Sequence, residues 1–167
     1  MSRNINKAVY AGSFDPFTNG HLVMVKKVSK LFDWVYVVMA NNSKKHRTYD
    51  IDKMKEVIQE ILKDNALYNV AVVTYDGLVA DFCREHDVQY LIRGLRNNMD
   101  YNYEENISDI NKLINPNVES VYFRAENDLE RTISSSMVKE LFSYGKDVSL
   151  YVPTKVLELM QSSTQNS

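Results

Sequence analysis

The sequence predicts an α/β protein built on a doubly wound, five-stranded parallel sheet. Five short apolar runs rich in β-branched and aromatic residues alternate with amphipathic stretches of helical spacing. Polar, basic and glycine residues follow several of these runs directly, at the edge where the carboxyl ends of parallel strands meet. With 167 residues, the chain has the size of one domain that buries its own core.

The first strand and helix frame the most informative stretch. An apolar run at 8–11 meets Gly12, a loop carries Asp15-Pro16, and an amphipathic helix begins around Thr18 to His21. In the first helical turn, the ring N–H of His21 would join the free backbone amides and the helix dipole in binding a phosphate oxygen. Taken alone, His21 favours an ordinary capping loop that leaves the ring partly exposed.

The remaining elements follow from periodicity and from start and stop signals. We expect one domain over 1–160 and a flexible tail over 161–167. The expected elements are a strand at 34–40, a helix capped by Asp50, a strand at 70–75, a helix at 78–85, a strand at 90–92, a helix at 99–114 that stops before Pro116, a strand at 118–123, a helix from Ser134 to Tyr144 ended by Gly145, and a helix from Pro153 to Met160.

Basic residues follow two of the strands. Lys44 and Lys45 come after the run at 34–40, where an ammonium could hold a phosphate as a point charge, although a solvated basic loop is the alternative. Arg93-Gly94-Leu95-Arg96 follows a strand that we expect to end at Ile92. In a loop or an opening helical turn, both arginines could face one anion; two surface arginines are the alternative.

A serine run begins a later helix. Ser134, Ser135 and Ser136 precede an apolar helical face, and their hydroxyl and amide groups could bind the terminal phosphates of a nucleotide. A capping motif needs only one serine, so the run favours phosphate binding without requiring it.

Composition and absent motifs exclude several classes of protein. A net charge of −2 with 44% hydrophobic residues argues against disorder and against a nucleic-acid coat. The single cysteine, Cys83, excludes an intramolecular disulfide, falls in an apolar helical phrase and suits a reducing compartment. The polar N-terminus and short apolar runs predict a cytoplasmic protein with no membrane segment. P-loop, nucleophile-elbow and metal-cluster motifs are absent, and we expect His46 and His86 on the surface.

These motifs together resemble those of a known family. Gly12 to Pro16 followed by Thr18-Asn19-Gly20-His21 is similar to the signature HxGH, or TxGH, of the nucleotidyltransferase superfamily. With the segments 93–96 and 133–136, the resemblance is to the bacterial phosphopantetheine adenylyltransferase family and covers nearly the whole chain. It implies a Rossmann-like fold and transfer of the adenylyl group of ATP to 4′-phosphopantetheine, giving 3′-dephospho-coenzyme A and pyrophosphate. It also implies Mg²⁺ carried mainly by the ATP phosphates without a protein metal site, feedback by coenzyme A, and a homohexamer.

The resemblance also implies roles for individual residues. The chain departs from the family pattern in two ways: the position of Ser13 is often threonine, and Glu130 to Thr132 stand where an aromatic residue commonly precedes the serines. The implied catalytic residues are His21, Lys44 and Arg96. The implied ATP-binding residues are Ser13, Phe14, His21, Gly94, Leu95, Arg96, Glu104, Glu130, Arg131, Thr132, Ile133, Ser134, Ser135 and Ser136. The implied acceptor-binding residues are Ser13, Lys44, Val79 and Arg93.

The chemistry fits a site rich in donors. A phosphate nucleophile is already ionised near neutral pH, so in-line attack needs positioning and charge neutralisation rather than a base or a covalent intermediate. Pyrophosphate would leave toward Ser134 to Ser136. Two rivals stay open: a nucleotidyltransferase for another acceptor, such as nicotinamide mononucleotide, and a nucleotide sensor without turnover. The sequence does not decide whether Tyr101, Tyr103 and Ile107 belong to the core or to an interface.

Overall fold

The computed structural model describes residues 4–41, 46–96 and 107–165, which contain one parallel five-stranded sheet in the order β3-β2-β1-β4-β5. The predicted α/β fold is confirmed. The strands are β1 (Lys7–Gly12), β2 (Trp34–Ala40), β3 (Val70–Tyr75), β4 (Tyr90–Leu95) and β5 (Glu119–Arg124). The helices are α1 (Asn19–Leu31), α2 (Ile51–Asp64), α3 (Val79–Glu85), α5 (Asp128–Thr132), α6 (Ser135–Ser143) and α7 (Thr154–Gln165), and residues 107–114 are also helical.

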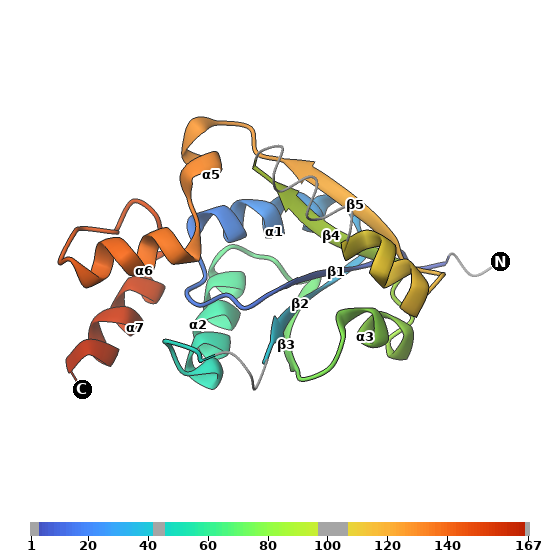
Figure 1. Cartoon of the computed structure of the whole chain (residues 1–167), viewed down its shortest axis with the longest axis horizontal. Coiled ribbons are helices and arrows are strands. Elements are labelled where there is room, and N and C mark those ends of the chain that lie inside the picture. Colours follow the sequence, from blue (N-terminus) through green and yellow to red (C-terminus); the bar gives the residue numbers. More distant parts are fainter. Residues whose placement is uncertain (1–3, 42–45, 97–106, 166–167) are drawn as a thin grey trace.

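Helices cover both faces of the sheet, which makes it doubly wound (Figure 1). Successive strand residues point to opposite faces, so Tyr10 joins the larger core cluster with α1, α2, α6 and α7, whereas its neighbour Val9 joins a smaller cluster with α3. The helical segment 107–114 lies on the α3 side, where the Asn115 side chain at its end donates to the Ala80 carbonyl at 3.2 Å. Because both faces are buried, β1 and β2 are nearly continuous apolar runs.

Local capping signals set most helix boundaries where the sequence predicts them. The Asp50 carboxylate accepts from the Lys53 backbone N–H at 3.0 Å, and the Ser134 hydroxyl accepts from that of Met137 at 3.1 Å. Gly145 follows α6 and ends this helical region. Its φ of 73° is a left-handed conformation that favours glycine.

Three boundaries differ from the prediction. β4 continues through Leu95 because its last residues pair with β5, in the register Gly94–Phe123 and Leu95–Arg124. The short helix α5 was not predicted. α7 continues past Met160 to Gln165, so the segment expected as a flexible tail is helical over 161–165, and ion pairs from Lys155 to α2 hold the start of α7.

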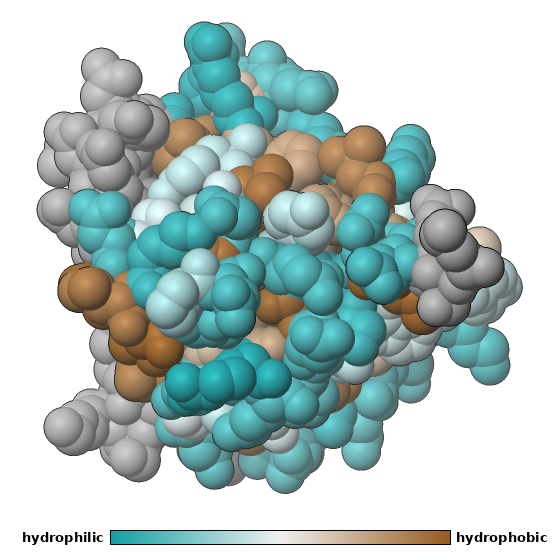
Figure 2. Space-filling model, turned by 90° about the vertical axis from the view of Figure 1, so that its right-hand side faces the viewer, coloured by the Kyte–Doolittle hydropathy of each residue, from teal (hydrophilic) through white to brown (hydrophobic). Residues whose placement is uncertain are grey.

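The surface facing the viewer in Figure 2 is largely hydrophilic, with separate hydrophobic groups. No helix within the three described ranges is long and apolar enough to cross a membrane. Cys83 is buried, as predicted. The prediction that His86 lies on the surface is only partly right, because its ring stacks on Phe82 at a centroid distance of 3.9 Å.

Candidate active site

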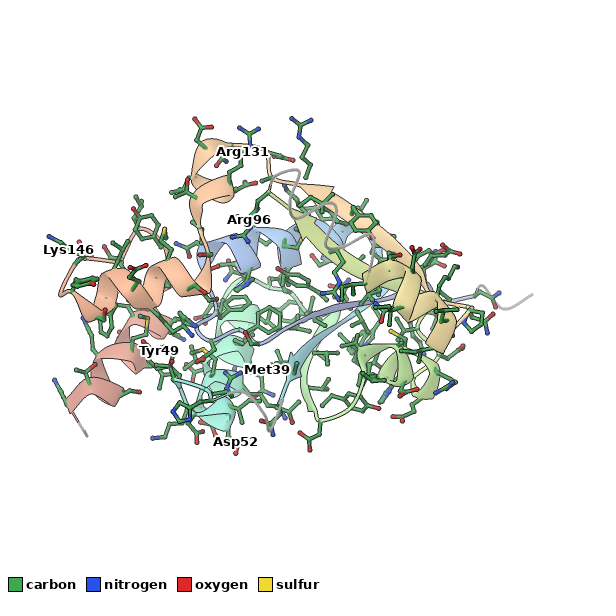
Figure 3. All side chains as sticks on the ribbon, viewed as in Figure 1. Met39, Tyr49, Asp52, Arg96, Arg131 and Lys146 are labelled. Atoms are coloured by element: carbon green, nitrogen blue, oxygen red, sulfur yellow. The ribbon has the colours of Figure 1, made fainter. Side chains whose placement is uncertain are left out.

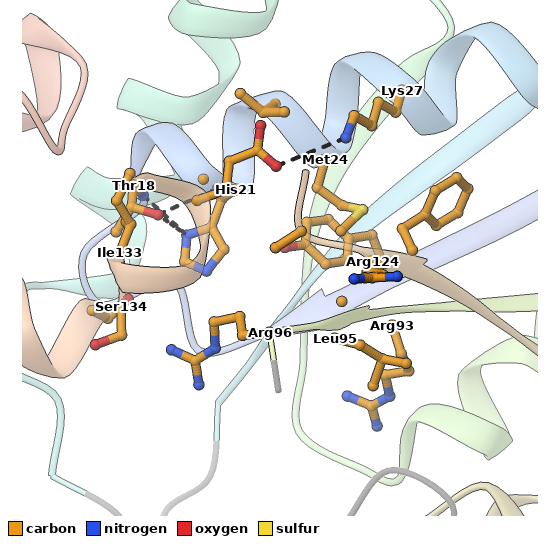
Figure 4. A pocket seen from close by; sticks show the side chains of 18 of the residues that line it. Thr18, His21, Met24, Lys27, Arg93, Leu95, Arg96, Arg124, Ile133 and Ser134 are labelled. Atoms are coloured by element: carbon orange, nitrogen blue, oxygen red, sulfur yellow. Dashed lines mark hydrogen bonds and ion pairs between the residues drawn. The ribbon is translucent and has the colours of Figure 1, made fainter. Parts of the chain in front are cut away.

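A pocket of about 290 Å³ opens at the carboxyl ends of β1, β4 and β5, beside the first turns of α1 (Figure 4). β1 and β4 are neighbours in the sheet, but the chain passes from β1 to β2 on one side and reaches β4 on the other. Open α/β sheets bind ligands at such a switch point because diverging connections leave a crevice there. The predicted meeting of the strand ends is therefore confirmed.

His21 lies at this crevice as the third residue of α1 and forms a reciprocal cap with Thr18. The Thr18 backbone N–H donates to His21 Nδ1 at 3.0 Å, and the His21 backbone N–H donates to Thr18 Oγ1 at 3.2 Å. Because Nδ1 accepts a hydrogen bond from the backbone, the neutral ring carries its hydrogen on Nε2. The site therefore holds a fixed N–H donor near the helix N-terminus.

Burial, and to a lesser extent the nearby positive charge of Arg96, lower the pKa of His21 to about 4. The imidazole is therefore neutral at physiological pH. Such a group stabilises developing negative charge by donating a hydrogen bond, without transferring a proton.

Aromatic rings hold His21 in place. The Phe14 ring meets that of His21 edge to face at 4.8 Å and is 1% exposed, and a Cβ at Gly12 would lie 3.3 Å from it. Phe14, with a φ of 47°, is therefore part of the floor under the histidine. Its ring does not line the pocket, and the predicted contact of Phe14 with ATP stays a prediction, with the backbone as the part that could make it.

The segment 93–96 is mainly strand, and this corrects the expected loop. Alternation along β4 directs Arg93 and Leu95 to the α3 side, whereas Gly94 faces α1, where a Cβ would lie 3.1 Å from Met24 Cε. Figure 4 shows Arg96 near His21 and Ser134, with Arg93 directed away from them. All four residues line the pocket, but the two arginines do not converge on one anion.

The serine segment is brought only partly into the site. Ile133, Ser134 and Ser135 line the pocket, and the Ser135 hydroxyl donates to the Pro16 carbonyl at 2.7 Å. Ser136 is exposed and does not line it.

Two neighbours on α5 also fall outside the lining. Arg131 and Thr132 are exposed, and Figure 3 shows Arg131 on the outside of the molecule. Both bond back to Asp128 within α5.

Glu130 lines the pocket and is already engaged by the protein. Its carboxylate accepts from the Glu126 backbone N–H at 2.9 Å and from Asn127 Nδ2 at 3.1 Å. Asn127 is the N-cap of α5, and its side-chain oxygen accepts from the Glu130 backbone N–H at 2.8 Å. Lys27 Nζ lies 2.9 Å from a Glu126 carboxylate oxygen and 3.9 Å from one of Glu130. The acid at this position is therefore explained by the construction of α5, a helix that sequence periodicity did not reveal.

Other predicted residues lie apart from this pocket. Ser13 is exposed and outside the lining, and half-buried Val79 packs on the α3 side of the sheet. Lys44 and Glu104 lie outside the described residues. Among residues the prediction omitted, Arg124 carries a signal that was overlooked, since it ends a strand as the basic segment 93–96 does. Lys27, on α1, lines the pocket beside Glu126 and Glu130, and no sequence motif marks it.

Metal-ligating side chains do not gather in the part of the chain that the structure describes: it contains no group of three or more His, Cys, Asp or Glu side chains placed to hold an ion. The pocket presents mainly cations and neutral donors, which suits polyphosphate.

Comparisons with known proteins agree with this geometry. Residues 9–141 match the cytidylyltransferase-like family. A phosphopantetheine adenylyltransferase from Vesicomyosocius okutanii subsp. Calyptogena okutanii is 40% identical over 92% of this chain and 96% of its own length, and one from Staphylococcus haemolyticus is 41% identical over 90% and 91%. Among solved structures, Plasmodium falciparum nicotinic acid mononucleotide adenylyltransferase in complex with NaAD has a TM-score of 0.71 at 14% identity, with 95% of this chain and 96% of that chain covered. At that identity, the likeness concerns the fold alone.

Proposed function

Because the chain belongs to the cytidylyltransferase-like family and, within it, to the phosphopantetheine adenylyltransferases, we propose that this pocket transfers the adenylyl group of ATP to 4′-phosphopantetheine, an adenylyl transfer of coenzyme A biosynthesis. The products are 3′-dephospho-coenzyme A and pyrophosphate. The observation that carries the mechanism is the fixed, neutral N–H donor of His21 in a pocket shared with Arg96 and Ser134.

Each residue of the pocket has its own role toward the nucleotide. His21 Nε2 donates to an oxygen of the α-phosphate, which gains negative charge as the new bond forms. Arg96 neutralises charge on the phosphates, and the N-terminus of α6 at Ser134 and Ser135 receives the departing pyrophosphate. Gly94 leaves room for the nucleotide next to Met24. ATP enters as its Mg²⁺ complex, so the ion belongs to the substrate.

The acceptor approaches from the side of Ser13, with Lys44, Arg93 and Val79 as its other proposed contacts. Its phosphate attacks the α-phosphorus in line with the bond to pyrophosphate, and no covalent enzyme intermediate forms. Because this nucleophile is ionised near neutral pH, the neutral His21 serves better as a donor than as a base.

The resemblance supports three further proposals about the enzyme. It forms a homohexamer, coenzyme A acts on it as a feedback ligand, and it works in the cytoplasm. For the last proposal, the chain adds a single, buried cysteine, which suits a reducing compartment.

The test is pyrophosphate release from ATP and Mg²⁺ with and without 4′-phosphopantetheine. Nicotinic acid mononucleotide serves as the competing acceptor, because the solved structures of similar fold include enzymes of that name. We expect release that requires 4′-phosphopantetheine and is at least about 100-fold slower with the mononucleotide, as for a site built to pair its substrate's polar groups. Equal or preferential use of the mononucleotide would refute the assigned acceptor, and ATP binding without release with either acceptor would indicate a sensor.

A further inference from the structure

Arg47 connects two segments of the chain beside the Ser13 loop. Its Nη1 donates to the Ser13 carbonyl at 2.5 Å, and its Nε donates to the Tyr49 carbonyl at 3.2 Å. The side chain is only 15% exposed although it carries a permanent charge. A guanidinium reaches two carbonyls at once because its donors form a rigid planar fork.

The counter-charge is Asp15, which is 4% exposed and organises the same region. Its carboxylate accepts from the backbone N–H groups of Thr48 and Tyr49, each at 2.9 Å. Arg47 Nη2 lies 3.9 Å from one of its oxygens, and Lys139 Nζ lies 3.5 Å from the other. The buried carboxylate is thus satisfied from two sides, which fixes the loop around it.

These contacts act on different parts of the loop. α6 holds its later part, through Lys139 on Asp15 and the Ser135 hydroxyl on the Pro16 carbonyl. Among the residues that the structure describes, Arg47 is the one whose side chain hydrogen-bonds the backbone of Ser13. Ser13 itself is exposed, so its hydroxyl direction depends on how its backbone is held.

One nitrogen of Arg47 makes no hydrogen bond within the described part of the chain. This nitrogen, Nη2, is buried and faces the Asp15 carboxylate only as an ion pair at 3.9 Å. The two bonds that Arg47 does make are to the carbonyls that set the Ser13 loop against residues 47–49.

We propose that Arg47 is a positioning residue for the acceptor. By holding the Ser13 carbonyl against the 47–49 segment, it fixes the Ser13 hydroxyl where the phosphate of 4′-phosphopantetheine is to bind. This inference rests on the proposed function, which places that phosphate at Ser13. Arg47 touches no reacting atom, because it acts through the backbone of Ser13.

The experiment is a double-mutant cycle on binding. Dissociation constants for 4′-phosphopantetheine and for ATP are measured by calorimetry on the wild type, Arg47→Met, Ser13→Ala and the double variant, with melting temperatures recorded. Arg47→Met keeps an unbranched stem and removes every donor. Arg84→Met is the matched control, because Arg84 pairs with Asp81 on α3, on the other face of the sheet from α6.

We expect Arg47→Met to weaken 4′-phosphopantetheine binding about tenfold, the scale of a misplaced contact, and to change ATP binding less than about twofold. Since Arg47 acts through Ser13, the two effects should not add. The dissociation constant of the double variant for 4′-phosphopantetheine should be at most about twofold higher than that of the single variant with the lower affinity. Arg47→Lys, which lacks the fork, should fall between wild type and Arg47→Met.

Three results would overturn the role of Arg47: unchanged acceptor binding in Arg47→Met, equal weakening of both ligands, or additive effects in the cycle. If Arg47→Met does not fold, Arg47→Lys carries the same cycle and the same criteria. A wild type that neither binds 4′-phosphopantetheine nor releases pyrophosphate with it overturns the proposed function and this inference with it. A wild type that does both, with an unaffected Arg47→Met, overturns only the inference.

Discussion

His21→Ala removes the fixed N–H donor from the pocket and tests the central assignment. The backbone N–H of Thr18 holds Nδ1 at 3.0 Å, and the ring of Phe14 packs against the imidazole, so Nε2–H is oriented before substrate binds. Loss of one preorganised donor to developing charge lowers kcat about 10²- to 10³-fold, or about 3–4 kcal/mol in the barrier. The KM for ATP should change little, since the bond strengthens mainly in the transition state.

The assay is pyrophosphate release at saturating ATP and 4′-phosphopantetheine, with the melting temperature of each variant. His86→Ala is the matched control, because His86 stacks on Phe82 on the far face of the sheet and should keep wild-type kcat. Thr18→Val removes the hydroxyl cap but keeps the backbone N–H on Nδ1, so it should cost about 1 kcal/mol of stability and little of kcat. A folded His21→Ala variant with kcat within about threefold of wild type would refute the mechanism.

Four further predictions follow from the same geometry. The pKa of His21 falls from 6.5 to about 4 on folding, so the unfolded chain binds more protons between these pH values, and the free energy of unfolding drops by up to about 3 kcal/mol as pH falls from 6.5 to 4. Denaturant titrations at several pH values should therefore show that the free energy of unfolding depends less on pH in His21→Ala. An equal pH dependence in both proteins would contradict the lowered pKa. Asp15→Asn leaves the partly buried cations Arg47 and Lys139 without their charge partner, so we expect a loss of about 3 kcal/mol in the free energy of unfolding and a melting temperature lower by about 10 °C, read by calorimetry. An unchanged melting temperature would show that the Asp15 carboxylate contributes little to stability. Gly94→Val fills the space beside the flexible tip of Met24, so the KM for ATP should rise about tenfold at nearly constant stability, and an unchanged KM would place the nucleotide elsewhere. Arg93→Ala should raise the KM for 4′-phosphopantetheine about tenfold while the KM for ATP stays within about twofold, in steady-state assays, because Arg93 points to the α3 side; the opposite pattern would assign Arg93 to the nucleotide.

Features of local origin were predictable. β2 and β3 have the predicted bounds, since a run of β-branched and aromatic residues between polar loops specifies a parallel strand by itself. Asp50 and Ser134 begin helices because a side-chain oxygen next to free backbone amides needs no distant partner. The clustering of candidate residues at one sheet edge was also predictable, because parallel strands all end on the same side.

The arrangement within the site was less predictable, because it depends on partners distant in sequence. β4 extends through Arg93 and Gly94 only because β5 supplies the pairing, and this extension separates the two arginines that a loop could have brought together. Phe14 belongs to a loop motif, yet its ring is buried under Gly12 and His21. The order of residues alone does not tell whether such a ring faces the ligand or the core.

The sequence by itself determined the fold class, the family and part of the lining of the crevice, since these follow from short-range periodicity, capping chemistry and motifs that are contiguous in the chain. Only the tertiary structure decided that Glu130 lies near Lys27, and that Arg47 hydrogen-bonds the backbone of Ser13 across 34 positions of sequence. Such contacts depend on how separate segments pack against one another, and a hydrogen bond between distant segments leaves no periodic trace in either of them.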